Sequence, residues 1–366
     1  MSPPSEASIA LARPASQAWG AAFAASLRTT GPLWILIGLY LAAAVWAAMQ
    51  LNAPLLQYLI DYAPVLGWLA VLGAALGLLA LLLRIAVIDN ERRPARRMLE
   101  EIRRYFAPGI AAQAIILLVA LIVMEDLFAF FKPLIPRFVP FSWDPALAAA
   151  DRAVFFGRNP WELLWPLAGN PFVTWVLSTA YTLWFFWMLL VWVLVAFATR
   201  HRKENVRYFF ATLMVWIVGG TLIATIFSSV GPCYFGNFDF GPNPFAAQMA
   251  GLYQINQSMP IYALGVQNAL WAGQAHPVPG TLAGISAFPS MHVAAAVLRT
   301  RIAFVHNRML GWISVILTAL IVAGSVHLGW HYAIDGIAGA WIAFAAWHVA
   351  GPILSWWQRR FPAPAR

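Results

Sequence analysis

The sequence predicts an all-α protein that crosses a membrane about eight times. Three observations predict this fold class: the composition, the length of the apolar runs and the positions of the basic residues. Of the 366 residues, 61% are hydrophobic and 10% are charged, whereas soluble domains contain about 25% charged residues. The chain is therefore expected to be an integral membrane protein.

Eight runs are long and apolar enough to be membrane-spanning helices. A bilayer core of about 30 Å requires a helix of about 17 residues or more. The runs cover residues 33–50, 64–88, 109–131, 172–198, 208–230, 290–306, 310–327 and 332–351. Their number and length predict a polytopic helical protein.

The basic residues predict how these helices are oriented. All but four of the 23 Lys and Arg lie at the termini or in the alternate connections 84–104, 200–207 and 299–308. Since cytoplasmic connections carry an excess of Lys and Arg, both termini are expected in the cytoplasm. The net charge of +9 then indicates orientation and a contact with anionic lipid. No nucleic-acid partner is expected.

Two long connections on the outer side interrupt the pattern of spans. Residues 132–171 are rich in Pro and aromatic side chains, which favours short helices in the membrane interface. Residues 231–289 contain too much Gly and Pro for a straight span, and one interfacial or re-entrant helix is expected between 245 and 272. The four remaining cations all lie in the first connection: Lys132, Arg137, Arg152 and Arg158.

Polar side chains gather at the outer ends of the last three predicted spans. The stretch "ISAFPSMHVAAAV" begins one span with His292, and "SVHLGWHYAIDGIAG" contains His327, His331 and Asp335. His331 and Asp335 are four residues apart and share a helix face. A carboxylate at that spacing can fix one imidazole nitrogen and leave the other as a nucleophile or base. Because ionisable groups are costly within a membrane, the cluster predicts a functional site.

Two kinds of site fit this cluster. Three histidines and a carboxylate can also bind a metal ion, as in a non-catalytic transporter or a metal-dependent membrane protein. Helical spacing alone does not separate a metal ligand from a catalyst, so both hypotheses stay open on this pattern.

The motifs "FPSMH" and "HLGWHYAIDGIAG" resemble the second and third signature motifs of the type 2 phosphatidic acid phosphatase superfamily. Members of this superfamily cleave or transfer phosphate groups on lipids. The resemblance implies a six-helix core over residues 109–351. Residues 1–108 then hold a cytoplasmic segment and two added spans, and residues 352–366 form a cytoplasmic tail.

The resemblance also implies a role for each residue of the motifs. His331 would be the nucleophile that forms a phosphohistidine, Asp335 its orienting carboxylate, and His292 the general acid that protonates the leaving oxygen. No cofactor and no metal ion is implied. The partners would be membrane lipids: a lipid phosphate donor, with an alcohol or water as the acceptor.

A third segment resembles one branch of the superfamily. Residues 151–164, "DRAVFFGRNPWELL", are similar to inositol phosphorylceramide synthases of sphingolipid metabolism and their bacterial relatives. This similarity favours a headgroup transferase slightly over a hydrolase. It also implies a protein of the bacterial inner membrane with a periplasmic active site.

The sequence departs from the superfamily at the cations that bind phosphate. The first motif, with its Lys and Arg-Pro, is absent from residues 224–235, and Ser325 stands where the third motif has an Arg. A phosphate in a low-dielectric site still requires countercharge. The candidates for this role are Lys132, Arg137, Ser290 and His327. The candidates for binding a headgroup or acceptor are Glu125, Asp126, Arg152 and Arg158. Arg299 and Arg301 are expected a helix length away from the site, on the cytoplasmic side.

Overall fold

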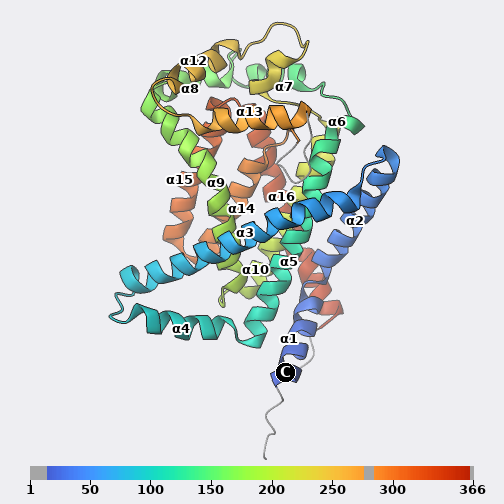
Figure 1. Ribbon diagram of the computed structural model, residues 1–366, viewed down its shortest axis with the longest axis vertical. Helices are drawn as coiled ribbons and strands as arrows, with labels where there is room; N and C mark the ends of the chain where they lie inside the picture. The colour runs from blue at the N-terminus through green and yellow to red at the C-terminus, as the bar shows by residue number, and fades with distance from the viewer. Residues whose placement is uncertain (1–14, 276–283, 363–366) are drawn as a thin grey trace, which may run out of the picture.

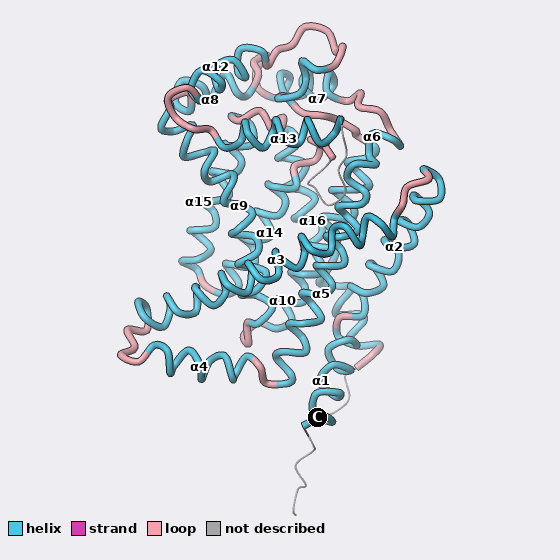
Figure 2. The backbone as a smooth tube through the Cα atoms, in the orientation of Figure 1, coloured by secondary structure: helices cyan, strands magenta, loops and turns pink. Residues whose placement is uncertain are grey.

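The structure is a computed structural model that describes residues 15–275 and 284–362. Within these ranges the chain consists of helices and loops without any strand (Figures 1 and 2). The predicted all-α fold class is therefore confirmed. Parts of the predicted terminal segments, and residues 276–283 of the connection 231–289, lie outside the described residues.

Seven helical segments of the described chain are long and apolar enough to cross a membrane. They are α2 (Gly31–Leu51), α3 (Leu55–Leu83) with η1 (Arg84–Ile88), α5 (Pro108–Phe131) with η2 (Lys132–Leu134) and α6 (Ile135–Phe138), α9 (Pro171–Phe197), α10 (Arg202–Met214) with η3 (Val215–Ile223) and α11 (Ala224–Ile226), α15 (Arg308–His327), and α16 (Ala333–Arg360). The protein is thus a multi-pass membrane protein.

The remaining predicted span, residues 290–306, is a shorter helix. It forms α14 (Met291–His306), which has 16 residues and contains Arg299 and Arg301. α14 nevertheless lies within the bundle, where it packs against α9, α10, α15 and α16. Seven of the eight predicted spans are therefore helices of membrane-spanning length in the described chain, and the eighth, residues 290–306, is a shorter helix.

Short helices cover one end of the bundle, which we call the capped end. They are α7 (Asp144–Val154), α8 (Pro160–Ala168), α12 (Ala246–Asn256) and α13 (Tyr262–Ala275), drawn at the top of Figure 1. The connection 231–289 was expected to hold one helix between 245 and 272. The structure shows two α-helices around this range, α12 and α13, because the chain turns before Pro260, whose ring cannot continue a helix.

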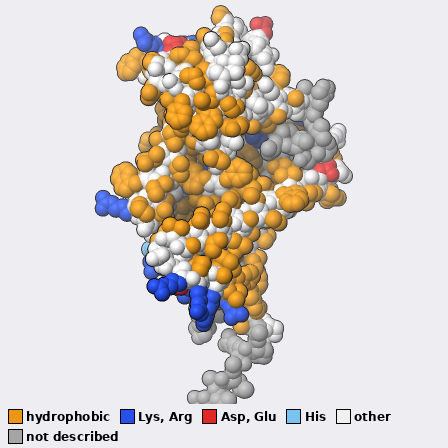
Figure 3. Space-filling view, turned by 60° about the vertical axis from the view of Figure 1, so that its left-hand side comes forward, with side chains coloured by type: hydrophobic (Ala, Val, Ile, Leu, Met, Phe, Trp, Pro, Cys, Tyr) orange, Lys and Arg blue, Asp and Glu red, His pale blue; other side chains and the backbone are white. Residues whose placement is uncertain are grey.

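The opposite end of the bundle is basic. α1 (Ala15–Thr29) and α4 (Pro94–Tyr105) lie there, and Lys and Arg side chains gather at this end in Figure 3. Hydrophobic side chains cover the broad middle of the molecule in the same view. The two added helices pack on the outside: α2 contacts α5 and α10, and α3 runs obliquely across α5 and α9.

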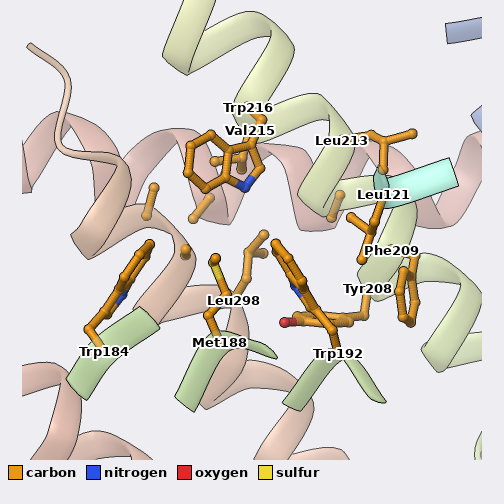
Figure 4. Packing of buried hydrophobic residues seen from close by; sticks show 14 of the residues in the cluster. Leu121, Trp184, Met188, Trp192, Tyr208, Phe209, Leu213, Val215, Trp216 and Leu298 are labelled. Atoms are coloured by element: carbon orange, nitrogen blue, oxygen red, sulfur yellow. The ribbon is translucent and has the colours of Figure 1, made fainter. Parts of the chain in front are cut away.

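The interior of the bundle is aromatic and closely packed (Figure 4). Because lipid tails are as apolar as these side chains, van der Waals packing between helices stabilises the bundle more than exclusion from lipid does. The packed side chains include Trp184, Met188, Trp192, Tyr208, Phe209, Trp216 and Leu298. A glycine allows two helix backbones to approach closely: a Cβ at Gly339 of α16 would lie 2.4 Å from the carbonyl oxygen of Ser290. This contact holds the start of α14 against α16.

Candidate active site

His331 lies in the turn between α15 and α16 and is buried to 7% exposure. Its Nδ1 lies 2.8 Å from the carbonyl oxygen of Ala287. Since a carbonyl oxygen can only accept a hydrogen bond, Nδ1 carries the proton and donates to Ala287. Nε2 is then the nitrogen with a free lone pair. A nucleophilic imidazole requires this tautomer.

Asp335 is the second partner of His331. Its Oδ2 lies 3.4 Å from the Nδ1 of His331 and accepts a hydrogen bond from the backbone N–H of Tyr332 at 3.0 Å. The carboxylate is fully buried. The predicted proximity of His331 and Asp335 is therefore present, but the shorter contact that orients the imidazole comes from the Ala287 carbonyl. A backbone group has no sequence signature, so no motif could have indicated it.

His292 lies at the first turn of α14, next to His331. The two ring centroids are 6.0 Å apart. The imidazole of His292 stacks on Tyr181, at 4.4 Å and an interplanar angle of 19°, and contacts the ring of Trp184 at 4.3 Å. Both aromatic residues belong to α9, and their three-residue spacing places them on one face. Sequence reasoning missed them because aromatic pairs at this spacing are common in membrane helices.

Ser290 caps the helix that carries His292. Its Oγ accepts a hydrogen bond from the N–H of Val293 at 3.4 Å, as an N-cap residue does. Its own N–H donates to the carbonyl oxygen of Asp335 at 3.0 Å. Ser290 thus ties α14 to α16 at the level of the two imidazoles. The positive end of α14 lies at this point.

His327 lies in a different environment. Its Nε2 is 3.0 Å from Oγ1 of Thr174, and its ring lies 5.4 Å from that of Trp165. It is fully buried, and no hydrogen bond or ring contact joins it to His292 or His331 within the described residues. The structure therefore places His327 against α8 and α9 and does not bring it into the imidazole pair.

Of the four cations predicted for the site, Lys132 is the one whose charge acts on His292. It follows α5 directly, and its charge acts electrostatically on Glu125 and His292. The chain leading into α14 lies against it: a Cβ at Gly284, whose φ is +91°, would be 2.7 Å from the carbonyl carbon of Lys132. Within the described residues, Lys132 forms no ion pair with a carboxylate at salt-bridge distance. Its ammonium group lies 6.0 Å from the ring of Phe128.

The other three predicted cations lie elsewhere. Arg137 donates from Nη2 to the carbonyl oxygen of Leu51 at 2.6 Å, so it closes the connection between α2 and α3. Arg152 belongs to α7, and Arg158 is exposed in the connection that follows. Neither Arg152 nor Arg158 forms a side-chain hydrogen bond or ion pair in the described part of the chain.

Glu125 and Asp126 lie on α5, one to two turns before Lys132. One carboxylate oxygen of each is buried without a hydrogen-bond partner in the described structure. Glu125 acts electrostatically on Tyr40 of α2 and on Tyr62 of α3. The two acidic residues therefore face a polar region between α5 and the two added helices.

Two further carboxylates, Asp144 and Asp151, position the turn that contains His331. Asp144 accepts hydrogen bonds from the N–H of Gly231 at 2.8 Å and from the hydroxyl of Tyr332 at 2.8 Å. Asp151 accepts from the N–H groups of Ala333 at 2.8 Å and Ile334 at 2.9 Å, the first turn of α16. Burial raises the pKa of both carboxyl groups, and these hydrogen bonds oppose the rise.

Sequence reasoning missed this pair. Asp144 and Asp151 are seven residues apart on α7, which places both on one helix face. The two Asp residues in "DPALAAAD" were the available signal, but the pattern does not reveal that the partner is the start of α16.

We predict that Asp151→Ala destabilises the start of α16. Loss of two charge-assisted hydrogen bonds should lower the free energy of unfolding by about 2 kcal/mol. The measurement is the thermal unfolding midpoint of the purified protein in detergent. Asp239→Ala, at an exposed Asp of the same end, is the control and should leave the midpoint unchanged. Equal shifts for the two variants would contradict the proposed role of Asp151.

No group of three or more His, Cys, Asp or Glu in the described part of the chain is arranged to hold a metal ion. The set of His292, His327, His331 and Asp335 considered from the sequence does not assemble, because His327 lies against Thr174. The geometry therefore fits an imidazole pair better than a metal centre.

The bundle and its site define a multi-pass membrane protein with two adjacent imidazoles beneath its capped end. A comparison with protein-family profiles matches residues 145–349 to the PAP2 superfamily. This match covers more than half of the chain and includes both imidazoles and Asp335. The chain belongs to the PAP2 superfamily, the type 2 phosphatidic acid phosphatases, and this membership suggests a phosphatase or phosphotransferase acting on lipid-type substrates. Comparisons with curated proteins and with solved structures find no match.

Proposed function

We propose that this protein transfers the phosphate group of a membrane lipid phosphoester through a phosphohistidine intermediate. His331 is the nucleophile, His292 is the general acid and base, and Lys132 holds the phosphate. The observation that carries the proposal is the hydrogen bond from Nδ1 of His331 to the Ala287 carbonyl, because it leaves Nε2 unprotonated beside a second imidazole.

The reaction has two steps. In the first, the lone pair of Nε2 of His331 forms a bond to phosphorus, the bond from phosphorus to the lipid oxygen breaks, and His292 donates a proton to that oxygen. In the second, His292 takes the proton of an acceptor hydroxyl, whose oxygen bonds to phosphorus as the bond to Nε2 breaks. Water as the acceptor gives a phosphatase, and an alcohol gives a headgroup transferase.

The transferase is the version that we favour, with an acceptor related to those of inositol phosphorylceramide synthases. Glu125 and Asp126 support it, because each has a buried carboxylate oxygen without a partner in the described structure, and such oxygens can accept from the hydroxyl groups of an acceptor. Their neighbour Lys132 acts electrostatically on His292, which would place acceptor and phosphate side by side. The basic residues at the end opposite the cap support a periplasmic site.

The test is lipid turnover by the purified protein in nanodiscs with an excess of chelator. We expect phosphate release or headgroup exchange from at least one lipid phosphoester, and added alcohol should divert the phosphoryl group from water to the alcohol. Turnover that chelator abolishes would contradict the proposal in favour of a metal-dependent protein. Ion flux without lipid turnover would favour a transporter.

We predict that Lys132→Gln weakens substrate binding. The loss of one charge-assisted contact to phosphate, worth about 1.5 to 3 kcal/mol, lowers kcat/KM by about 10- to 100-fold. Steady-state kinetics with the active lipid measures this effect. Arg158→Gln removes a cation of the same connection that is exposed, and it should leave kcat/KM within about twofold of wild type. A similar loss in both variants would show that only the net charge of this end matters.

A further inference from the structure

Arg299 is a buried cation without an acceptor. Its side chain is 1% exposed, and its Nε, Nη1 and Nη2 form no hydrogen bond within the described residues. Arg299 was expected a helix length away from the site, and the structure corrects this distance: Arg299 is buried in the bundle, two turns from His292 on α14. An ionisable side chain in such a position is a functional candidate by default.

The contacts of Arg299 are aromatic. Its guanidinium carbon lies 4.8 Å from the ring centroid of Trp184 and 4.2 Å from that of Trp187. Both are residues of α9, three positions apart. A desolvated cation–π contact offsets only part of the cost of burying an unpaired charge. Arg299 is thus expected to lower the stability of the bundle relative to an apolar side chain of the same length.

Trp184 connects Arg299 to the proposed acid. Its ring contacts the guanidinium of Arg299. The same ring lies 4.3 Å from the imidazole of His292, and its indole N–H donates to the His292 carbonyl oxygen at 3.1 Å. Arg299 and His292 are seven residues apart, which is about 10.5 Å along the helix. The indole is thus a shared contact of two residues on α14.

The indole of Trp184 also borders a groove at the side of the bundle. Trp184 and Trp187 line a groove of about 280 Å³ between α9 and α15, whose other walls include Leu183, Leu317 and Ile321. Two contacts from α14 meet the indole beside this groove: the hydrogen bond to the His292 carbonyl and the guanidinium of Arg299.

We propose that Arg299 is a positioning residue for His292 and acts through Trp184. The cation holds the indole plane, and the indole supports the imidazole in the orientation that delivers its proton to the leaving oxygen. The proposal rests on the function proposed above for His292. Since Arg299 does not contact the substrate in this account, its loss should lower kcat and leave KM unchanged.

The first experiment compares Arg299→Met, which keeps the length and removes the charge, with Arg299→Lys, which keeps a cation. We expect kcat on the active lipid to fall about tenfold in Arg299→Met, with KM unchanged. In Arg299→Lys, kcat should return most of the way to the wild-type value. The thermal unfolding midpoint of Arg299→Met should equal or exceed that of wild type.

Three results would overturn the inference. The first is an unchanged kcat in Arg299→Met. The second is a lower kcat in Arg299→Met together with a lower unfolding midpoint, which would indicate a purely structural role. The third is a loss of kcat in Arg299→Lys equal to that in Arg299→Met. A wild-type protein that turns over no lipid phosphoester contradicts the proposed function itself, and the inference then falls with it. The unfolding measurement separates these cases because it requires no substrate.

A second experiment tests the route through Trp184. In a Trp184→Leu background the additional effect of Arg299→Met on kcat should shrink to less than about threefold, because residues that act through one contact are not additive. In a Trp187→Leu background, which retains the Trp184 contact, most of the effect should persist. Additive losses in the Trp184→Leu background would overturn the route.

Discussion

Replacing His331 by Gln should abolish turnover of the lipid substrate, with a loss in kcat of more than about 10⁴-fold. Glutamine can still donate to the Ala287 carbonyl, which accepts from Nδ1 of His331 at 2.8 Å, but it has no nitrogen lone pair to attack phosphorus. The fold should therefore persist while the chemistry is lost. The measurement is single-turnover kinetics with unfolding monitored in parallel.

The control for this variant is His348→Gln. His348 lies on the same helix, α16, and is exposed, so its replacement should leave kcat within about twofold of wild type. Substantial residual activity in His331→Gln, with an unchanged unfolding midpoint, would exclude His331 as the nucleophile.

Replacing His292 by Ala should lower kcat on the natural lipid by about 10² to 10⁴-fold. The loss should depend on the leaving group, because the proposed role of His292 is to protonate the departing oxygen. A nitrophenyl phosphate needs little protonation, so the variant should recover most of the first-step rate on this substrate. His331→Gln should show no such recovery.

The comparison of leaving groups separates the two histidines. An equal loss for both substrates in His292→Ala would mean that His292 binds the phosphate or holds the site together, and does not act as an acid. Unfolding midpoints are needed here because His292 packs between Tyr181 and Trp184. Loss of the imidazole leaves a gap in that stack.

The helices and the approach of His331 to His292 could be predicted from the sequence for physical reasons. Apolar runs specify membrane helices because the bilayer requires internal backbone hydrogen bonds. The distribution of cations then assigned the ends of the spans to two sides. Three helix ends were therefore expected at one depth, and they carry His292, His327, and His331 with Asp335. The helix α14 is shorter than the usual span because Asn307, whose backbone is extended, ends it after 16 residues and caps α15.

The contacts that orient the site could not be predicted. The Ala287 carbonyl and the helix α7, whose Asp151 caps α16, act through backbone groups and tertiary packing that leave no local pattern. His327 was assigned to the site because it lies near the end of a span, but its ring turns toward Thr174. The position of a residue at a helix end determines its depth in the membrane, but it does not determine the direction in which its side chain points.

Counting the Lys and Arg residues of the sequence only partly identified the cation that binds phosphate in place of the missing motif residues. The sequence left Lys132 and Arg137 as equal candidates, and the structure separates them, because Arg137 binds the Leu51 carbonyl while Lys132 lies against Gly284. Lys132, Glu125 and Asp126 precede the residues matched to the superfamily. Their roles are therefore proposed from the structure of this chain alone.

The most direct test of the central claim is to trap the intermediate. The purified protein is mixed with lipid carrying a labelled phosphate group, quenched at alkaline pH within one turnover, and digested for mass spectrometry. We expect an acid-labile, alkali-stable phosphate on the peptide that contains His331, and none in His331→Gln. Turnover by wild type without label on any histidine, or with label on another residue, would contradict the account.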